Sequence, residues 1–138
     1  NTPGIPQTEL NPVWSDWRNL NQNREALRSH TVHFDYDSTA IRSGERANIA
    51  AVASYLNANA REGLLIEGHC DERGTEEYNR SLGERRALAL REALMAAGAD
   101  GSRITTVSFG KDKKVDQGNS EAAHAKNRRG EFVVLTPK

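Results

Sequence analysis

The sequence predicts an α/β fold in which helices pack against one small sheet. Two hydrophobic patterns alternate along the chain: short apolar runs, and longer segments with an apolar residue every three or four positions. The first pattern is typical of strands and the second of helices that bury one face. Because the two patterns alternate, the helices are expected to cover the sheet as an α/β sandwich.

Four short runs are predicted to be strands, and three longer segments are predicted to be helices. The expected strands span 31–34, 64–68, 104–109 and 130–136, and the expected helices span about 43–62, 75–97 and 120–127. Gly98 ends the longest helix, since glycine is common just beyond a helix C-terminus. Ser120 is a plausible cap for the last helix.

Residues 1–30 are predicted to form a flexible leader, with a possible short helix, before a domain over residues 31–136. The first twelve residues contain three of the four prolines and lack periodicity. Trp14 and Trp17 then follow a roughly helical spacing. Two interpretations stay open for these tryptophans: they pack onto the domain, or they form a helix that docks a partner.

Charge and cysteine content exclude several functional classes. The chain has 19 basic and 19 acidic residues, so it lacks the basic excess that nucleic-acid binding requires, and no nucleic-acid partner is expected. A single cysteine, Cys70, excludes an internal disulfide and does not by itself make a structural zinc site. No segment approaches the roughly 20 apolar residues needed to span a bilayer.

A polar loop, His69 to Gly74, follows the second predicted strand and precedes the longest helix. Ligands in open α/β sheets tend to bind beyond the carboxyl ends of strands. In the helix, Arg86 lies on the apolar stripe, where burying its unpaired charge would be costly. Asp71 is the nearest candidate partner. The pair is either a salt bridge that pins the helix to the loop, or a clamp for a ligand with an ammonium and a carboxylate.

An enzyme and a metal site are the two rival interpretations. His69, Cys70 and Asp71 are contiguous, so their side chains alternate between faces of a strand and are not expected to converge as a catalytic triad. His30 and His33 have a spacing that suits ligands on a helix, but their segment is predicted to be a strand. We therefore expect no catalytic residues, no metal and no cofactor, and Cys70 is expected to be a small buried thiol.

Several longer strings resemble the OmpA-like domain family. They are Phe34 to Asp37 (FDYD), Glu67 to Thr75 (EGHCDERGT), Glu77 to Ala87 (EYNRSLGERRA), Val107 to Lys111 (VSFGK) and Glu121 to Arg129 (EAAHAKNRR). Within the family, their wording is most similar to the peptidoglycan-associated lipoproteins. The resemblance extends over about residues 31–136 and implies a β-α-β-α-β-α-β order with a small mixed sheet of about four strands.

The resemblance also implies a function, which is non-covalent binding of the peptidoglycan stem peptide. The domain would hold the free end of the meso-diaminopimelate in that peptide. The family's site aspartate and arginine fall on Asp71 and Arg86, each opposite one charge of that zwitterion. The other family site positions fall on Asp37, Asn79, Leu82 and Arg129, the last of which borders the pocket or braces the fold.

The cellular setting that the resemblance implies is the periplasm of a Gram-negative-type bacterium. The domain would tether the outer membrane to the wall in a Tol-Pal-type system, through an N-terminal lipid anchor that is not in this chain. A TolB-like periplasmic protein is an implied partner. The alternative function is a periplasmic protein-interaction scaffold that does not bind the wall. Cys70 departs from the family pattern, in which alanine or threonine is usual.

Overall fold

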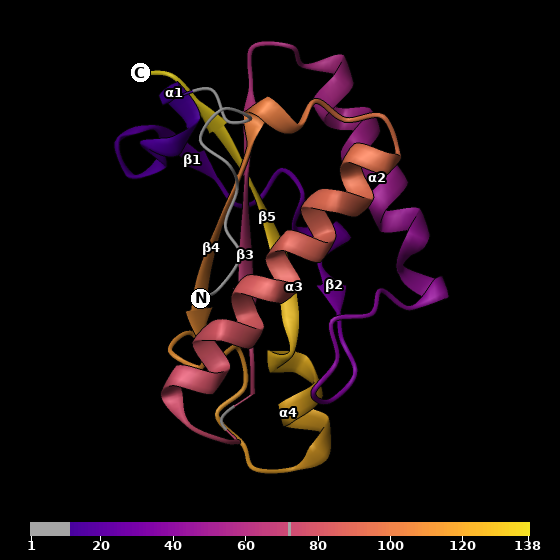
Figure 1. Cartoon of the computed structure of the whole chain (residues 1–138), viewed down its shortest axis with the longest axis vertical. Coiled ribbons are helices and arrows are strands. Elements are labelled where there is room, and N and C mark those ends of the chain that lie inside the picture. Colours follow the sequence, from indigo (N-terminus) through magenta and orange to yellow (C-terminus); the bar gives the residue numbers. More distant parts are fainter. Residues whose placement is uncertain (1–11, 72) are drawn as a thin grey trace.

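A computed structural model describes residues 12–71 and 73–138, which form one mixed sheet with two long helices against one of its faces (Figure 1). The strands are β1 (Asn21–Asn23), β2 (Val32–His33), β3 (Gly63–His69), β4 (Ile104–Gly110) and β5 (Arg129–Thr136). The α-helices are α1 (Pro12–Ser15), α2 (Arg46–Ala58), α3 (Glu76–Ala96) and α4 (Glu121–Asn127). Short 3-10 helices span Trp17–Asn19, Arg28–His30, Ser43–Glu45 and Gly101–Arg103.

The sheet has the strand order β1-β5-β3-β4, and β2 also pairs with β5. The β3–β4 pairing is parallel, whereas β5 is antiparallel to β1, β2 and β3. From β2 to β5 the elements alternate as β-α-β-α-β-α-β, which confirms the predicted α/β class. The described sheet has one strand more than the expected four, because β1 comes from the predicted leader.

Side-chain capping defines where two of the helices begin. Thr75 accepts a hydrogen bond from the Tyr78 amide at the start of α3, and Ser120 accepts one from the Ala123 amide at the start of α4. Each cap satisfies a backbone N–H that the helix itself leaves unpaired. Beyond α3, Gly98 has a φ of 100°, a left-handed conformation that glycine adopts without steric cost.

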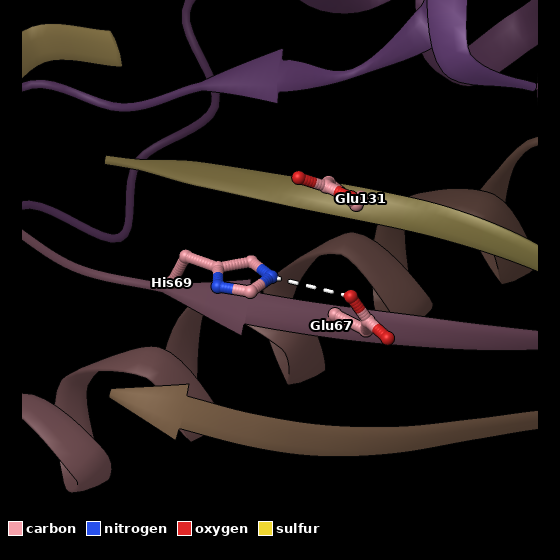
Figure 2. A group of neighbouring side chains, drawn as sticks. All are labelled: Glu67, His69 and Glu131. Atoms are coloured by element: carbon pink, nitrogen blue, oxygen red, sulfur yellow. Dashed lines mark hydrogen bonds and ion pairs between the residues drawn. The ribbon is translucent and has the colours of Figure 1, made fainter. Parts of the chain in front are cut away.

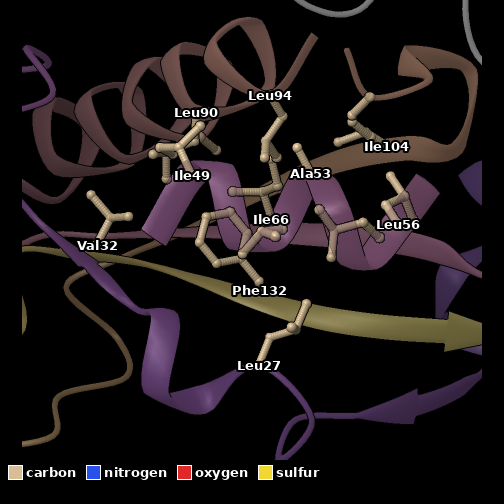
Figure 3. Packing of buried hydrophobic residues seen from close by; sticks show 14 of the residues in the cluster. Leu27, Val32, Ile49, Ala53, Leu56, Ile66, Leu90, Leu94, Ile104 and Phe132 are labelled. Atoms are coloured by element: carbon tan, nitrogen blue, oxygen red, sulfur yellow. The ribbon is translucent and has the colours of Figure 1, made fainter. Parts of the chain in front are cut away.

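The main core fills the space between the sheet and helices α2 and α3 (Figure 3). On β3, Leu64 and Ile66 belong to this core, whereas Leu65 belongs to a second cluster. Because side chains alternate along a strand, these two clusters lie on opposite faces of the sheet. The second cluster contains Trp14 and Trp17 with Leu65, Val133 and Leu135.

The expectation of a flexible leader over residues 1–30 needs correction for residues 12–30, while residues 1–11 lie outside the described part. Trp14 and Trp17 are buried against the sheet face that α2 and α3 leave open, and Leu27 is buried in the main core. Strand β1 pairs with β5 over three residues. The segment is packed because its large apolar side chains cover a face of the sheet that would otherwise be exposed to water.

Across the described residues, no helix combines the length and the apolar character that crossing a bilayer requires.

Candidate functional site

A small pocket lies where β3 ends and α3 begins, at the carboxyl end of a strand as predicted for the polar loop. Its volume is about 40 Å³, enough for one or two water molecules. Five of the six predicted site residues line it, and Arg129 does not. The lining residues are Tyr36, Asp37, Cys70, Asp71, Arg73, Gly74, Tyr78, Asn79, Leu82 and Arg86.

Arg86 is held from three sides by main-chain carbonyl groups. Its Nε donates to the Ser38 oxygen at 2.9 Å, Nη1 to the His69 oxygen at 3.2 Å, and Nη2 to the Asp35 oxygen at 3.0 Å. The guanidinium also lies over the Phe34 ring, 5.1 Å from its centroid. These contacts orient the guanidinium. A guanidinium has more N–H donors than these three hydrogen bonds use, so donors remain for a further acceptor.

The charge of Arg86 is unusual because the side chain is completely buried, with 0% of its surface exposed. Among the described residues it forms no ion pair, and burial lowers the pKa of its guanidinium. Carbonyl oxygens satisfy its donors but do not neutralise its charge. A buried cation of this kind is an attractive site for an anionic ligand group, because burying an unpaired charge is costly.

Asp71 forms its ion pairs with other arginines. Its Oδ2 lies 2.7 Å from Nη2 of Arg73 and 3.3 Å from Nη1 of Arg128, and its Oδ1 accepts from the Arg73 amide at 3.0 Å. Burial by itself raises the pKa of Asp71, but the hydrogen bonds from Arg73 and Arg128 bring it below its ordinary value. The Asp71–Arg86 salt bridge considered from spacing is therefore not the arrangement in this structure.

Asn79 holds the loop in place at the start of α3. Its Nδ2 donates to the carbonyl oxygens of Arg73 at 2.7 Å and Thr75 at 2.8 Å. Gly74, between them, has a φ of 86°, which favours glycine. The position predicted as a site residue thus shapes the pocket by fixing the backbone that carries Arg73.

Asp37 lies on the opposite wall, in the turn after β2. Its φ of 54° is a left-handed conformation that aspartate tolerates better than most residues. One carboxylate oxygen accepts a hydrogen bond from the Tyr78 hydroxyl. Tyr36 and Tyr78 are both largely exposed and form the rim, and the guanidinium of Arg73 stacks 4.0 Å from the Tyr36 ring centroid.

Leu82 and Cys70 supply the apolar part of the pocket and are almost fully buried. The Cys70 thiol donates to the Asn79 carbonyl oxygen at 3.1 Å, and burial raises its pKa to about 11. The predicted small buried thiol is therefore confirmed. Cys70 shares the pocket with Asp71 because β3 ends at His69, so strict alternation of faces no longer applies.

Arg129 lies elsewhere, which corrects the expectation that it borders the pocket. Its Nε is 2.5 Å from the Glu131 carboxylate, and its Nη2 donates to the Lys113 carbonyl oxygen at 2.9 Å. Arg128, its neighbour, contacts Asp71 instead. Sequence reasoning did not single out Arg128, Arg73, Tyr36 or Tyr78, although all four fall in the strings that resemble the family.

Among the described residues, one group of three side chains lies close enough together to bind a metal ion. Glu67, His69 and Glu131 place one ligand atom each within 4.8 Å of one another (Figure 2). Both carboxylates are already engaged by arginines: Arg24 contacts Glu67 at 2.6 Å and Arg129 contacts Glu131 at 2.5 Å. Two guanidiniums at this position disfavour a divalent cation by charge repulsion.

The residues considered for catalysis or metal binding are dispersed. His69 stacks on Phe109 and contacts Glu67, whereas the Cys70 thiol donates a hydrogen bond to the Asn79 carbonyl oxygen in the pocket of Asp71 and Arg86. His30 contacts Asn48 instead of His33. His69 and Cys70 therefore contact different parts of the molecule, and their arrangement does not form a nucleophile–base pair.

The chain is similar to known proteins along most of its length. Residues 33–128 match the family model described as OmpA family. A peptidoglycan-associated lipoprotein of Haemophilus influenzae is 47% identical over 103 residues, which are 74% of this chain and 67% of that protein. The corresponding protein of Legionella pneumophila is 43% identical over 109 residues, covering 79% of this chain and 62% of the relative's length.

Solved structures give the same result. The crystal structure of the peptidoglycan-associated lipoprotein from Burkholderia pseudomallei matches with a TM-score of 0.73 and 41% identity, covering 75% of this chain and 88% of that one. The C-terminal domain of Helicobacter pylori MotB matches with a TM-score of 0.71 at 20% identity, covering 77% of this chain and 84% of that one, a likeness in fold alone. The family match, the identities and the shared fold agree: the chain belongs to the OmpA family.

Proposed function

We propose that this chain binds peptidoglycan without chemical conversion, through the zwitterionic end of meso-diaminopimelate in the stem peptide. The observation that carries the proposal is the buried Arg86 guanidinium, which has no ion-pair partner among the described residues and lines a pocket that Asp71 also lines. A ligand carboxylate would neutralise Arg86, and Asp71 would accept from the ligand ammonium. The relatives in Haemophilus, Legionella and Burkholderia are named peptidoglycan-associated, which supports peptidoglycan as the polymer that is bound.

The pocket has to open for this ligand, because about 40 Å³ is too small for an amino-acid group. Arg73 is the residue that gives way in our proposal. Its side chain is 37% exposed, and its guanidinium pairs with the Asp71 carboxylate and lies over the Tyr36 ring. Only the Arg73 end of this pair reaches water, since the Asp71 side chain is 5% exposed. A ligand ammonium can take the place of Arg73 because it leaves the buried Asp71 carboxylate paired with a cation. Arg128 would remain as the buried support of Asp71.

In the cell, the proposed role is to tether the outer membrane to the wall from the periplasm as part of a Tol-Pal-type system. The support is the similarity to proteins named lipoproteins, of which the Legionella example extends well beyond the matched region, since this chain spans 62% of its length. A lipid anchor and a TolB-like partner belong to this proposal at the level of the whole protein.

Sedimentation with purified sacculi tests the proposal. Asp71→Asn removes the carboxylate proposed to bind the ligand ammonium, and Arg86→Lys replaces the planar guanidinium proposed to bind the ligand carboxylate. Each variant should weaken binding by on the order of 2–5 kcal/mol. The matched controls are Asp112→Asn and Arg80→Lys, both at exposed positions. Circular dichroism should show that all four variants fold. Undiminished binding by both site variants would overturn the site and favour the alternative of a protein scaffold.

A competition experiment with free amino acids distinguishes recognition of diaminopimelate from simple charge attraction. Free meso-diaminopimelate should displace the chain from sacculi, whereas lysine should compete poorly because it lacks the second zwitterionic centre. Equal competition by lysine would contradict the two-charge clamp.

A further inference from the structure

A second, larger pocket lies on the face of the sheet that α2 and α3 leave open. It has a volume of about 660 Å³, within the range of small-ligand sites. Segment 24–33, the ends of β3 and β5, and the loop after β4 surround it. Glu67 and His69 are on its floor, two and four residues beyond Leu65 on the same face of β3.

The lining is strongly basic, although the chain has no net charge. Six cationic side chains face two carboxylates, those of Glu67 and Glu131. Burial lowers the pKa of both His33 and His69, which disfavours the charged form of these imidazoles. The cationic residues are Arg24, Arg28, Lys113, Lys114, Lys126 and Arg129.

The floor of the pocket is already balanced in charge. Arg24 forms two contacts with Glu67, at 2.8 and 2.6 Å, and Arg129 contacts Glu131 at 2.5 Å. His69 also contacts Glu67, with its Nε2 3.3 Å from Oε1, the oxygen that Nη1 of Arg24 contacts as well (Figure 2). These pairs brace the floor. At the rim, Arg28 is paired with Glu25 at 2.7 Å, so the proposal rests on the amines of Lys113 and Lys126.

The rim lysines are held near the pocket by weakly competing contacts. The Lys113 amine lies over the Phe109 ring, 4.1 Å from its centroid, and its carbonyl oxygen accepts from Arg129. Lys126 is 3.5 Å from Asp116, but its side chain is 65% exposed. An exposed pair of this kind is worth little. Both amines are therefore available to an anion that enters the pocket.

We propose that this pocket binds a phosphate monoester, carried either by a soluble sugar phosphate or by a lipid headgroup. Ammonium groups act as mobile point charges that suit a phosphate dianion. A concave pocket of this volume fits a small charged group, whereas a protein partner would require a broad surface. The site is distinct from the pocket of Asp71 and Arg86, so it does not depend on wall binding.

Titration of the whole chain with glucose 1-phosphate at constant ionic strength, followed by NMR, tests the proposal. Amide shifts should saturate around Lys113, Lys126 and Arg24, and glucose should cause none. The double variant Lys113→Gln with Lys126→Gln should raise the dissociation constant by about tenfold. The matched double variant Lys111→Gln with Lys138→Gln removes the same charge outside the pocket and should bind as the unmodified chain does. Sacculus binding should be unchanged in both.

Vesicles identify the source of the phosphate. If phosphatidylcholine vesicles containing phosphatidic acid sediment the chain, and glucose 1-phosphate releases it, the ligand is a headgroup. If only the soluble ester binds, the ligand is a sugar phosphate. The proposal is overturned if no shift saturates, if both double variants weaken binding equally, or if a glutamate-rich peptide binds where the phosphate ester does not.

Discussion

Arg128 and Asp71 form a buried ion pair, with Nη1 and Oδ2 3.3 Å apart and both side chains less than a tenth exposed. Arg128 also donates from Nε to the Phe34 carbonyl oxygen at 3.0 Å, and its own carbonyl accepts from the Phe34 amide. It therefore ties α4 to the turn after β2 and to the pocket loop. This one side chain supports two walls of the proposed peptidoglycan site.

Replacing Arg128 by methionine should lower the free energy of unfolding by about 3 kcal/mol, because it leaves a buried carboxylate with fewer partners. Urea unfolding measures the change. Arg80→Met is the matched control: Arg80 is 60% exposed and 3.6 Å from Glu76, so its loss should cost less than about 1 kcal/mol. Equal losses for the two variants would contradict a supporting role for Arg128.

Glu67 should make the fold sensitive to acid. Burial by itself raises its pKa, but hydrogen bonds from His69 and Arg24 lower it from 4.5 to about 2. Because the folded pKa is the lower one, this stabilisation is present above pH 4.5 and is lost as the pH falls toward 2. It amounts to about 3 kcal/mol.

Urea unfolding at a series of pH values between 7 and 2 measures this loss. Glu67→Gln removes the titrating group, so its stability should fall less steeply than that of the unmodified chain over the acid range. Parallel pH profiles for the two chains would show that Glu67 does not carry this dependence.

Cys70 should react slowly with alkylating reagents while the chain is folded. Its buried thiol has a pKa raised to about 11, and only the thiolate is a strong nucleophile. The rate of reaction with iodoacetamide at about pH 8 should be much lower than in concentrated urea. Cys70→Ala combined with Gly44→Cys provides an exposed thiol for comparison. A folded rate for Cys70 equal to that of the exposed thiol would disprove the prediction.

Gly68 should not tolerate alanine, because β3 and α3 touch at this position. A Cβ on Gly68 would lie 1.8 Å from the Gly83 carbonyl oxygen, which is a backbone atom that cannot move aside alone. We expect a loss of about 3 kcal/mol from overpacking. Gly44→Ala is the control, since a Cβ there meets no atom within 4 Å, and thermal unfolding compares the two. A neutral Gly68→Ala would mean that α3 packs less closely than described.

Local patterns predicted most of the fold. The strands and helices from β2 to β5 follow from periodicity and from the cap predicted at Ser120, because these signals act within a few residues. Strand β1 could not be predicted in this way. Its three residues are all exposed and polar, and it is a strand because the neighbouring tryptophans pack on the sheet and bring it beside β5.

For the site, the sequence by itself determined that Arg86 lies on the inward face of its helix and that Asp71 lies at the mouth of the preceding strand. Helical and strand periodicity are local properties, and they are sufficient for both positions. Only the tertiary structure decided the partners of these charges: Arg86 turns to three carbonyl oxygens, and Asp71 pairs with Arg73 and Arg128. The tertiary structure also decided which of two neighbouring arginines contacts the pocket. Arg128 and Arg129 lie where α4 ends and β5 begins and point to different sides of the sheet, and spacing alone does not say which of them contacts Asp71.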